Sequence, residues 1–328
     1  MKMFPKIPVS IAAIIMIVLI MLPIFIDAES SYFIYLLFVI FIYIIMAQSW
    51  NLIAGYTGQM SLGTQAFFGL GAYGAALAWQ FGVAGYMSIA GFIIAGMSAV
   101  VVALLIGAPL LSKLRGDYFT LGTLGLGEIL KVCFIQGKTI TGGAVGVMMP
   151  SDAYDGMLTY YYWALLIMGL CLLSIWIMVH SRIGLAMRSI REDEDAADSN
   201  GVPVLRIKLL AFAYGAFFIG MAGALQAYYM FHIHPYGMFS INWGLWPILM
   251  VILGGIGTFL GPIIGAIVLA CIFEISAYWA PELQTLFSGI LIILVTLFMP
   301  RGVMYFFTKN KSSPVAFASL RRWLGLKT

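Results

Sequence analysis

Polar side chains that could bind a ligand or line a conduction path crowd into one short stretch, GYTGQMSLGTQAFFG, between two apolar runs. Besides Thr57, the stretch holds Gln59, Ser61, Thr64 and Gln65. A helix face in lipid would not collect such residues, whereas interrupted helices with glycines and polar side chains commonly line binding or conduction sites. A solvated loop capped by Ser and Thr would explain Thr57 and Gln59 but explains Gln65 poorly. We therefore predict that Gln59, Ser61, Thr64 and Gln65 line a polar path.

Two carboxylates, Glu128 and Glu274, lie inside apolar runs. A charge at the centre of a bilayer costs about 2.5–3.5 kcal/mol on insertion scales, so such residues are candidates for function. Lys131 follows Glu128 by one helical turn, close enough to form an ion pair. Two interpretations of Glu128 therefore stay open, a packing ion pair and a residue along the path. Glu274 has no local basic partner and is expected to reach water near the end of its run.

The most charged stretch of the chain is SIREDEDAADSNG, residues 189–201, which holds five of the thirteen acids. Apolar residues recur with helical spacing over 183–198, and Gly201 and Pro203 then supply a stop. This pattern predicts one short amphipathic helix outside the membrane, charged on one face. Such helices rest on lipid headgroups or fit a groove in a partner. Because the acids oppose binding to anionic lipid, we predict a protein partner.

Catalysis has no visible apparatus in this sequence, and we predict that the chain is not an enzyme. GLGAYG (residues 69–74) matches a dinucleotide motif but lies inside an apolar run, without the strand that the motif requires. GKT (residues 137–139) lacks the earlier glycine of a phosphate-binding loop, because position 132 is Val132. His232 and His234 have no third metal ligand nearby, and the three cysteines lie far apart. The sequence therefore predicts no metal site, no nucleotide site and no cofactor in this chain.

The elements that position these residues must be membrane helices. The chain has 328 residues, of which 62% are hydrophobic and 9% are charged, whereas soluble domains are about half apolar and a quarter charged. A spanning helix needs about 20 mostly apolar residues. We predict an all-α polytopic membrane protein of about ten spans, of which the eighth is short. The candidate runs are 7–26, 32–53, 62–79, 87–111, 118–135, 160–179, 209–231, 245–253, 262–278 and 283–299.

The basic residues predict the orientation, because Lys and Arg accumulate in cytoplasmic loops. With both termini inside, ten helices place 15 of the 17 basic residues on the cytoplasmic side, leaving Lys131 in a span and Lys138 outside. This explains the net charge of +4 without nucleic-acid binding. The same threading puts loop 180–208, with the charged stretch, in the cytoplasm. It also makes 301–328 a basic cytoplasmic tail after a membrane domain over residues 1–300.

Two glycine-rich segments, NLIAGYTGQMSLG (51–63) and LMVILGGIGTFLG (249–261), look alike and fall at predicted inner turns. Their similarity suggests an internal duplication of the kind common in transporters, and chance in a glycine-rich chain is the rival explanation. GTFLGPIIG places Gly257, Gly261 and Gly265 four apart. Small residues let helix backbones approach closely in lipid, so packing is the expected role of this stripe.

One short motif carries a resemblance to a known family. DAADSNG (195–201) resembles the E-A-A-x-x-x-G signature of ABC importer permeases, with Asp195 in place of Glu. The wider chain is similar to the LivM-type permeases for branched-chain amino acids, in stretches such as GDYFTLGTLGLGEILK, TGGAVGV and LMVILGGIGTFLGPIIGA. The resemblance implies that the charged stretch is a coupling helix docked on an ATPase. The residues that this role would involve are Arg188, Arg191, Glu194, Asp195, Ala196, Ala197 and Gly201.

The resemblance also implies the rest of the machine. Its members work with a second, homologous permease, two cytoplasmic ATPase subunits that bind ATP, and an extracytoplasmic solute-binding protein. The implied function is ATP-driven import by alternating access across a bacterial or archaeal cytoplasmic membrane. Thr64 stands where the family usually has His, and urea and short-chain amide permeases share much of the pattern. Those solutes are one alternative, and an ion-coupled secondary transporter with Glu128 as coupling carboxylate is another.

Overall fold

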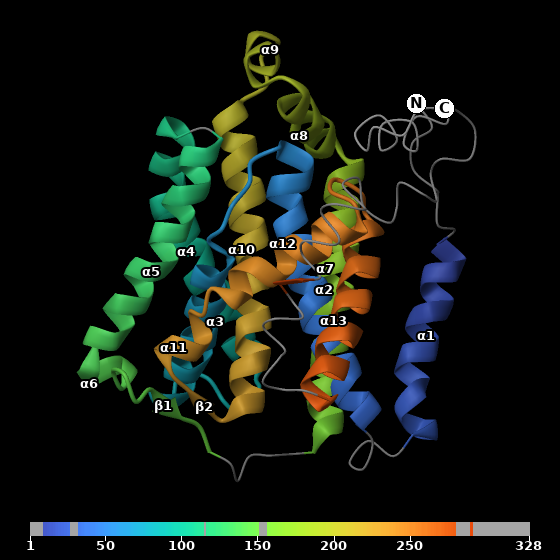
Figure 1. Ribbon diagram of the computed structural model, residues 1–328, viewed down its shortest axis with the longest axis vertical. Helices are drawn as coiled ribbons and strands as arrows, with labels where there is room; N and C mark the ends of the chain where they lie inside the picture. Colours follow the sequence, from blue (N-terminus) through green and yellow to red (C-terminus); the bar gives the residue numbers. More distant parts are fainter. Residues whose placement is uncertain (1–8, 27–31, 115, 151–155, 280–288, 291–328) are drawn as a thin grey trace, which may run out of the picture.

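The computed structural model describes residues 9–26, 32–114, 116–150, 156–279 and 289–290. In these ranges the chain is almost entirely helical, and its long helices lie side by side along one axis (Figure 1). The elements are α1 (Val9–Phe25), α2 (Tyr32–Thr57), α3 (Thr64–Gln80), α4 (Ile89–Lys113), α5 (Asp117–Gln136), α6 (Lys138–Thr141), β1 (Val147–Met148), α7 (Met157–His180), α8 (Arg182–Glu192), α9 (Glu194–Ser199), α10 (Val204–Met230), β2 (His232–Ile233), α11 (Pro235–Met238), α12 (Asn242–Gly254) and α13 (Gly261–Trp279).

Nine of the ten predicted apolar runs coincide with helices, namely α1 to α5, α7, α10, α12 and α13. The tenth, 283–299, lies outside the described residues apart from positions 289 and 290, as does the tail 301–328. Within the described residues, six helical stretches are long and apolar enough to cross a membrane: Tyr32–Thr57, Ile89–Lys113, Asp117–Gln136, Met157–His180, Val204–Met230 and Pro235–Gly254. The structure is thus that of a multi-pass helical membrane protein, and the count of ten spans stays a prediction.

The centre of the bundle is formed by α10 packed against α3 and α4. A Cβ atom added to Gly71 would lie 2.0 Å from the carbonyl oxygen of Gly220, and one on Gly223 would lie 2.0 Å from that of Phe68. Glycines therefore bring α3 and α10 into backbone contact, as expected for helices in lipid. Gly71 belongs to GLGAYG, so this apparent dinucleotide motif is helix packing, as its position in an apolar run predicted.

Helix α3 does not continue directly from α2. Helix α2 ends at Thr57, Gly58 has a left-handed φ of +76°, and residues 58–63 run without helical structure before α3 begins at Thr64. These residues, which we name the polar segment, pass from the α8–α9 end of the molecule toward the middle of the bundle (Figure 1). With 17 residues, α3 is correspondingly short. The break falls between the predicted runs 32–53 and 62–79, as the sequence indicated.

Loop 180–208 forms two helices, α8 and α9, and our prediction of a single helix over 183–198 is wrong. The backbone of Asp193 is extended, with φ −157° and ψ 114°, and its carboxylate accepts a hydrogen bond of 2.9 Å from the Ala196 N–H. An aspartate in this position caps a helix by pairing an N–H group that has no partner within the helix. Gly201, at φ +80°, and Pro203 then separate α9 from α10, as predicted.

The predicted glycine stripe 257–261–265 is divided, because the helix does not run through it. Gly257 lies in the turn between α12 and α13 at φ +75°, and only Gly261 and Gly265 are helical. A Cβ atom on Gly265 would lie 1.8 Å from the Met250 carbonyl oxygen, and one on Gly254 equally close to that of Gly261. The packing role is therefore confirmed for Gly261 and Gly265, which hold α13 against α12.

The end of the molecule opposite α9 contains the only described departure from an all-α fold. Strands β1 and β2 pair antiparallel, with Val147 opposite Ile233 and Met148 opposite His232. His234 accepts a hydrogen bond from the Gly237 N–H and so caps α11, while the His232 ring lies 2.9 Å from the Val145 carbonyl oxygen. Both histidines thus have local structural contacts.

Candidate functional site

Three residues on one face of α2, at positions i, i+3 and i+7, meet the turn between α12 and α13. Gln48 donates to the carbonyl oxygen of Phe259, and Asn51 donates to that of Thr258 at 2.9 Å. The Asn51 side-chain oxygen accepts a hydrogen bond of 2.8 Å from the Gly257 N–H. Buried backbone groups need such partners, because an unpaired one costs about 1–3 kcal/mol. The side chains of α2 therefore complete the hydrogen bonding of a turn that lies 206 residues away in sequence.

The third residue, Gly55, brings the two glycine-rich segments into direct contact. A Cβ atom on Gly55 would lie 2.7 Å from the Gly257 nitrogen, and one on Gly257 would lie 2.7 Å from the Gly55 carbonyl oxygen. The same Gly55 oxygen accepts a hydrogen bond of 2.6 Å from Nη1 of Arg191 on α8. We name this meeting of α2, α8 and the α12–α13 turn the glycine junction.

The polar segment has its backbone groups paired by side chains of the neighbouring helices. Trp50 of α2 donates to the carbonyl oxygen of Ser61 at 2.7 Å. From α5, Thr120 donates to the Met60 carbonyl at 3.1 Å, and the Thr123 hydroxyl accepts from the Leu62 N–H at 3.0 Å. Non-helical backbone at membrane depth is tolerated only when it is buried in protein or lines a water-filled cavity. These contacts provide the protein environment that the segment requires.

The structure brings four of the predicted path residues together and leaves the fifth apart. Gln59, Ser61, Thr64 and Gln65 are all buried, and Ser61 and Thr64 line a narrow hollow together with Trp50 of α2 and Phe212 of α10. Glu128 lies on α5, with its side chain 45% exposed and paired with Lys131 as predicted. The predicted exposure of Glu274 to water is only partial, because its carboxylate accepts a hydrogen bond from Tyr32.

Gln65 is the least satisfied of these polar side chains. It is fully buried, and neither its amide nitrogen nor its amide oxygen has a hydrogen-bond partner among the residues that the structure describes. Its side chain lies between two glycines, since a Cβ atom on Gly127 would be 2.7 Å from Nε2 and one on Gly244 would be 2.2 Å from Oε1. A buried amide without partners costs free energy, so each such group in a folded protein calls for an explanation.

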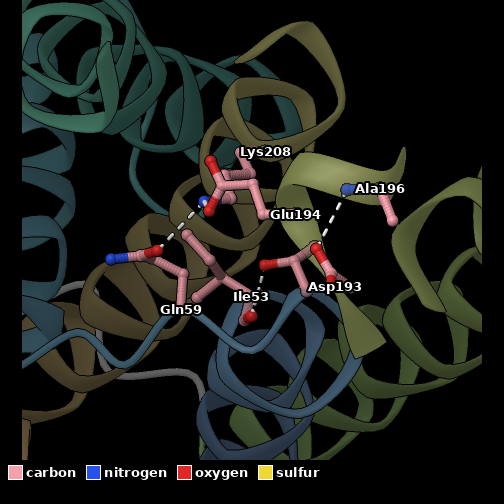
Figure 2. A network of polar contacts seen from close by, with 7 residues as sticks. Ile53, Gln59, Asp193, Glu194, Ala196 and Lys208 are labelled. Carbon is pink, nitrogen blue, oxygen red and sulfur yellow. Dashed lines mark hydrogen bonds and ion pairs between the residues drawn. The ribbon is translucent and has the colours of Figure 1, made fainter. Parts of the chain in front are cut away.

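Lys208 of α10 connects the charged stretch to the polar segment. Its Nζ lies 2.6 Å from Oε2 of Glu194 on α9 and donates to Oε1 of Gln59 at 3.2 Å (Figure 2). Among the described Lys, Arg, Asp and Glu residues, Lys208 alone is buried, with 2% of its surface exposed. Our sequence analysis missed this residue, although a lysine directly before an apolar helix was a usable signal.

The predicted coupling residues are divided between the interior and the surface. Asp195 and Ala196 are exposed, and Gly201 has open space around its α-carbon. Ala197, by contrast, is 4% exposed, because it packs against the protein itself. The Arg188 guanidinium donates to the Val179 carbonyl at 3.4 Å. Arg191 and Glu194 likewise direct polar atoms toward the bundle. The exposed side of α9 therefore begins at Asp195 and Ala196, and Ala197 is unsuited to a contact with a partner.

Sequence reasoning also missed Gln48 and Asn51, although their spacing with Gly55 along an apolar helix was visible. Within the described ranges, no three His, Cys, Asp or Glu residues come together in a way that could hold a metal ion. The observed chemistry is hydrogen bonding around an interrupted helix and a pair of short helices attached to it.

Comparison with known proteins identifies a family for this arrangement. The chain is 31% identical to the high-affinity branched-chain amino acid transport system permease protein LivM of Escherichia coli K12, over 80% of this chain and 68% of the relative. It is 29% identical to LivH of Salmonella typhimurium, over 61% of this chain and 63% of the relative. No solved structure matches the chain. A family model described as "Branched-chain amino acid transport system / permease component" matches residues 32–296, from α2 onward, and the chain belongs to this family of transport permeases.

Proposed function

We propose that this chain is the transmembrane permease subunit of an ATP-driven ABC importer for branched-chain amino acids. One observation carries the proposal beyond the family. The two short helices outside the bundle are bonded to its polar segment on one side, through Lys208 and Glu194, and expose Asp195 and Ala196 on the other. A helix held in this way can receive a partner on its exposed face and pass on the partner's movement through its buried face.

The partners that we propose are those of the family's machine. Two cytoplasmic ATPases would dock on the α8–α9 end, a second homologous permease would lie beside this one in the membrane, and a solute-binding protein would deliver the solute outside. Ten spans with both termini in the cytoplasm of a bacterial or archaeal cell remain our topology. The position of α8 and α9 at one end of the bundle agrees with this orientation (Figure 1).

The polar segment and the start of α3 form the part of the path that we assign to this chain. Gln59, Ser61, Thr64 and Gln65 would face the solute when the bundle changes between its inward-open and outward-open forms. Gln65 supports this assignment, because its buried amide finds no hydrogen-bond partner in the described part of the chain. Glu128 sits with Lys131 on the far side of α5 from the packed face, where a second permease subunit would shield the pair from lipid.

Reconstitution tests the proposal. The permease pair and the ATPases are placed in proteoliposomes with the binding protein, and uptake of labelled leucine is measured with and without ATP. We expect uptake that depends on ATP and is unchanged by a protonophore. An excess of unlabelled leucine should reduce the uptake, whereas urea should not. Uptake that follows an ion gradient at constant ATP would replace the proposal with a secondary transporter, and competition by urea would replace the solute.

The docking face is tested by Ala196→Arg, a bulky cation on the exposed side of α9. We expect loss of co-purification of the ATPases, with the permease present at the wild-type level, because the side chain lies outside the packed bundle. Val83→Arg, at a residue that is also exposed but lies at the opposite end, is the control and should retain the ATPases. Normal co-purification with Ala196→Arg would remove α9 from the interface.

The orientation is tested by cysteine labelling in a cysteine-free parent. Val145→Cys, which is 76% exposed at the end opposite α9, should react with an impermeant reagent in intact cells. Ser199→Cys, exposed at the end of α9, should react only after permeabilisation. The reverse pattern would invert the topology.

A further inference from the structure

We infer that Lys208 is the positioning residue that links movement of α9 to the polar segment, and thus ATPase engagement to the path. The inference deepens the proposed function and rests on it. Its basis is the convergence of three elements on one ammonium group: Glu194 from α9, Gln59 from the polar segment, and Lys208 itself from the second turn of α10 (Figure 2).

The burial of Lys208 makes the loss of its ion pair with Glu194 energetically costly. An ammonium group removed from water carries a desolvation cost of several kcal/mol, which only well-placed acceptors offset. Lys208 is 2% exposed, while the carboxylate that it contacts belongs to Glu194 of α9, a side chain that is 27% exposed. Movement of Glu194 away from the bundle would leave the ammonium with fewer acceptors. A movement of Glu194 therefore favours a movement of Lys208 and Gln59 in the same direction, because this keeps the ammonium group paired.

The backbone on both sides of the link is suited to such movement. Helix α9 is a separate short body, bounded by the extended Asp193 and the left-handed Gly201. On the other side, Gln59 directly follows Gly58, where α2 has ended, and it begins a segment without a helical hydrogen-bond ladder. Displacement of Gln59 is transmitted along this segment to Ser61 and then to Thr64, the first residue of α3.

Arg191 also connects the two short helices to the bundle, but its contact does not end on a movable segment. Arg191 donates to Gly55, which lies inside α2 and is packed against Gly257. That contact ties α8 to the rigid glycine junction, whereas the contact of Lys208 ends on a non-helical segment. The two basic residues thus have different roles: Arg191 would hold the pivot of the two short helices, and Lys208 would carry the moving end.

The test uses the complete importer in proteoliposomes and measures the number of solute molecules imported per ATP hydrolysed. Lys208→Met keeps an unbranched side chain that is one heavy atom shorter and removes both polar contacts. We expect this ratio to fall about tenfold, in the range typical of coupling between sites, while the ATPases still co-purify. Glu194→Gln, a change at a partly exposed side chain, should lower the same ratio less and provides a second variant if Lys208→Met does not fold. Combining the two should add little, since they break one link.

Controls separate coupling from simple stabilisation. Arg206→Met and Glu192→Gln change exposed charges on the neighbouring turns and should leave the ratio unchanged. Lys208→Arg keeps a cation and should restore part of the ratio. A Lys208→Met complex that loses uptake and hydrolysis in proportion, with a lower Tm and an unchanged ratio, would overturn the inference in favour of a purely structural ion pair. A wild-type complex without ATP-driven uptake would instead refute the proposed function, and the inference with it.

Discussion

The two glycine-rich segments, residues 51–63 and 249–261, meet at the glycine junction, but the backbone that follows the junction differs between them. The second segment closes a short turn, and the chain returns at once in α13, packed on α12 through Gly254 and Gly261. In addition to the bonds from Gln48 and Asn51, the Thr258 hydroxyl pairs two groups of this turn locally, since it donates to the Gly255 carbonyl at 2.8 Å and accepts from the Gly261 N–H at 3.1 Å. The first segment opens into six non-helical residues that depend on distant side chains for their hydrogen bonds.

This difference shows how one kind of glycine contact can serve two purposes. At the α12–α13 turn, paired backbone groups and close packing give a rigid support. Along the polar segment, the side chains of Trp50, Thr120 and Thr123 pair backbone groups that have no helical hydrogen bonds. A segment with few internal hydrogen bonds has low local stability, and moving parts of proteins are drawn from such regions. The rigid turn and the movable segment are therefore placed side by side, in contact through Gly55 and Gly257.

The largest effect is expected from Gly257→Val, which would break the contact on which the comparison depends. The position has φ +75°, and the added Cβ atom would lie 2.7 Å from the Gly55 carbonyl oxygen. Left-handed backbone and a clash with another backbone together should cost about 4 kcal/mol or more, a range in which proteins commonly fail to fold. The protein level in membranes and the Tm in detergent measure this loss. Gly125→Val is the control, since nothing lies within 4 Å of its added Cβ atom, and equal losses in both variants would contradict the assigned role of the junction.

A smaller loss is expected from Asn51→Leu, which keeps the junction's shape but removes the two hydrogen bonds to Gly257 and Thr258. Leaving these backbone groups without partners should lower the free energy of unfolding by about 2–3 kcal/mol. The Tm in detergent should fall accordingly, and the exposed Asn242→Leu should leave it nearly unchanged. If the Tm of Asn51→Leu equals that of the wild type, the turn satisfies itself and the rigid support does not come from α2.

The smallest effect on stability is expected from Gln65→Leu. This variant tests the role of the start of α3, which follows the polar segment, in the path. Because neither amide atom of Gln65 is paired, an apolar side chain of similar volume should change stability by less than about 1 kcal/mol and could raise it. Uptake should nevertheless fall while the Tm is retained, since the amide is proposed to meet the solute. Unchanged uptake in proteoliposomes would take Gln65 out of the path and leave its burial as packing.

The sequence by itself determined the helices, because length and apolar composition act within one segment and need no distant partner. The nine predicted runs that lie within the described residues are all helices, and the break after Thr57 was indicated by the glycines and polar residues around it. The break at Asp193 was missed although its signal is local, since an aspartate three residues before a free N–H is a common cap. The regular apolar spacing over 183–198 favoured one continuous helix, so the capping role of Asp193 was overlooked.

Only the tertiary structure decided which residues work together. The pairing of Asn51 with Gly257, the burial of Lys208 between Glu194 and Gln59, and the burial of Ala197 against its own chain all depend on contacts between distant elements. No local spacing records them, because two segments far apart in sequence meet only after the helices have packed. Helix formation is a property of neighbours along the chain, whereas the burial of a charge or an alanine depends on what the completed fold places against it.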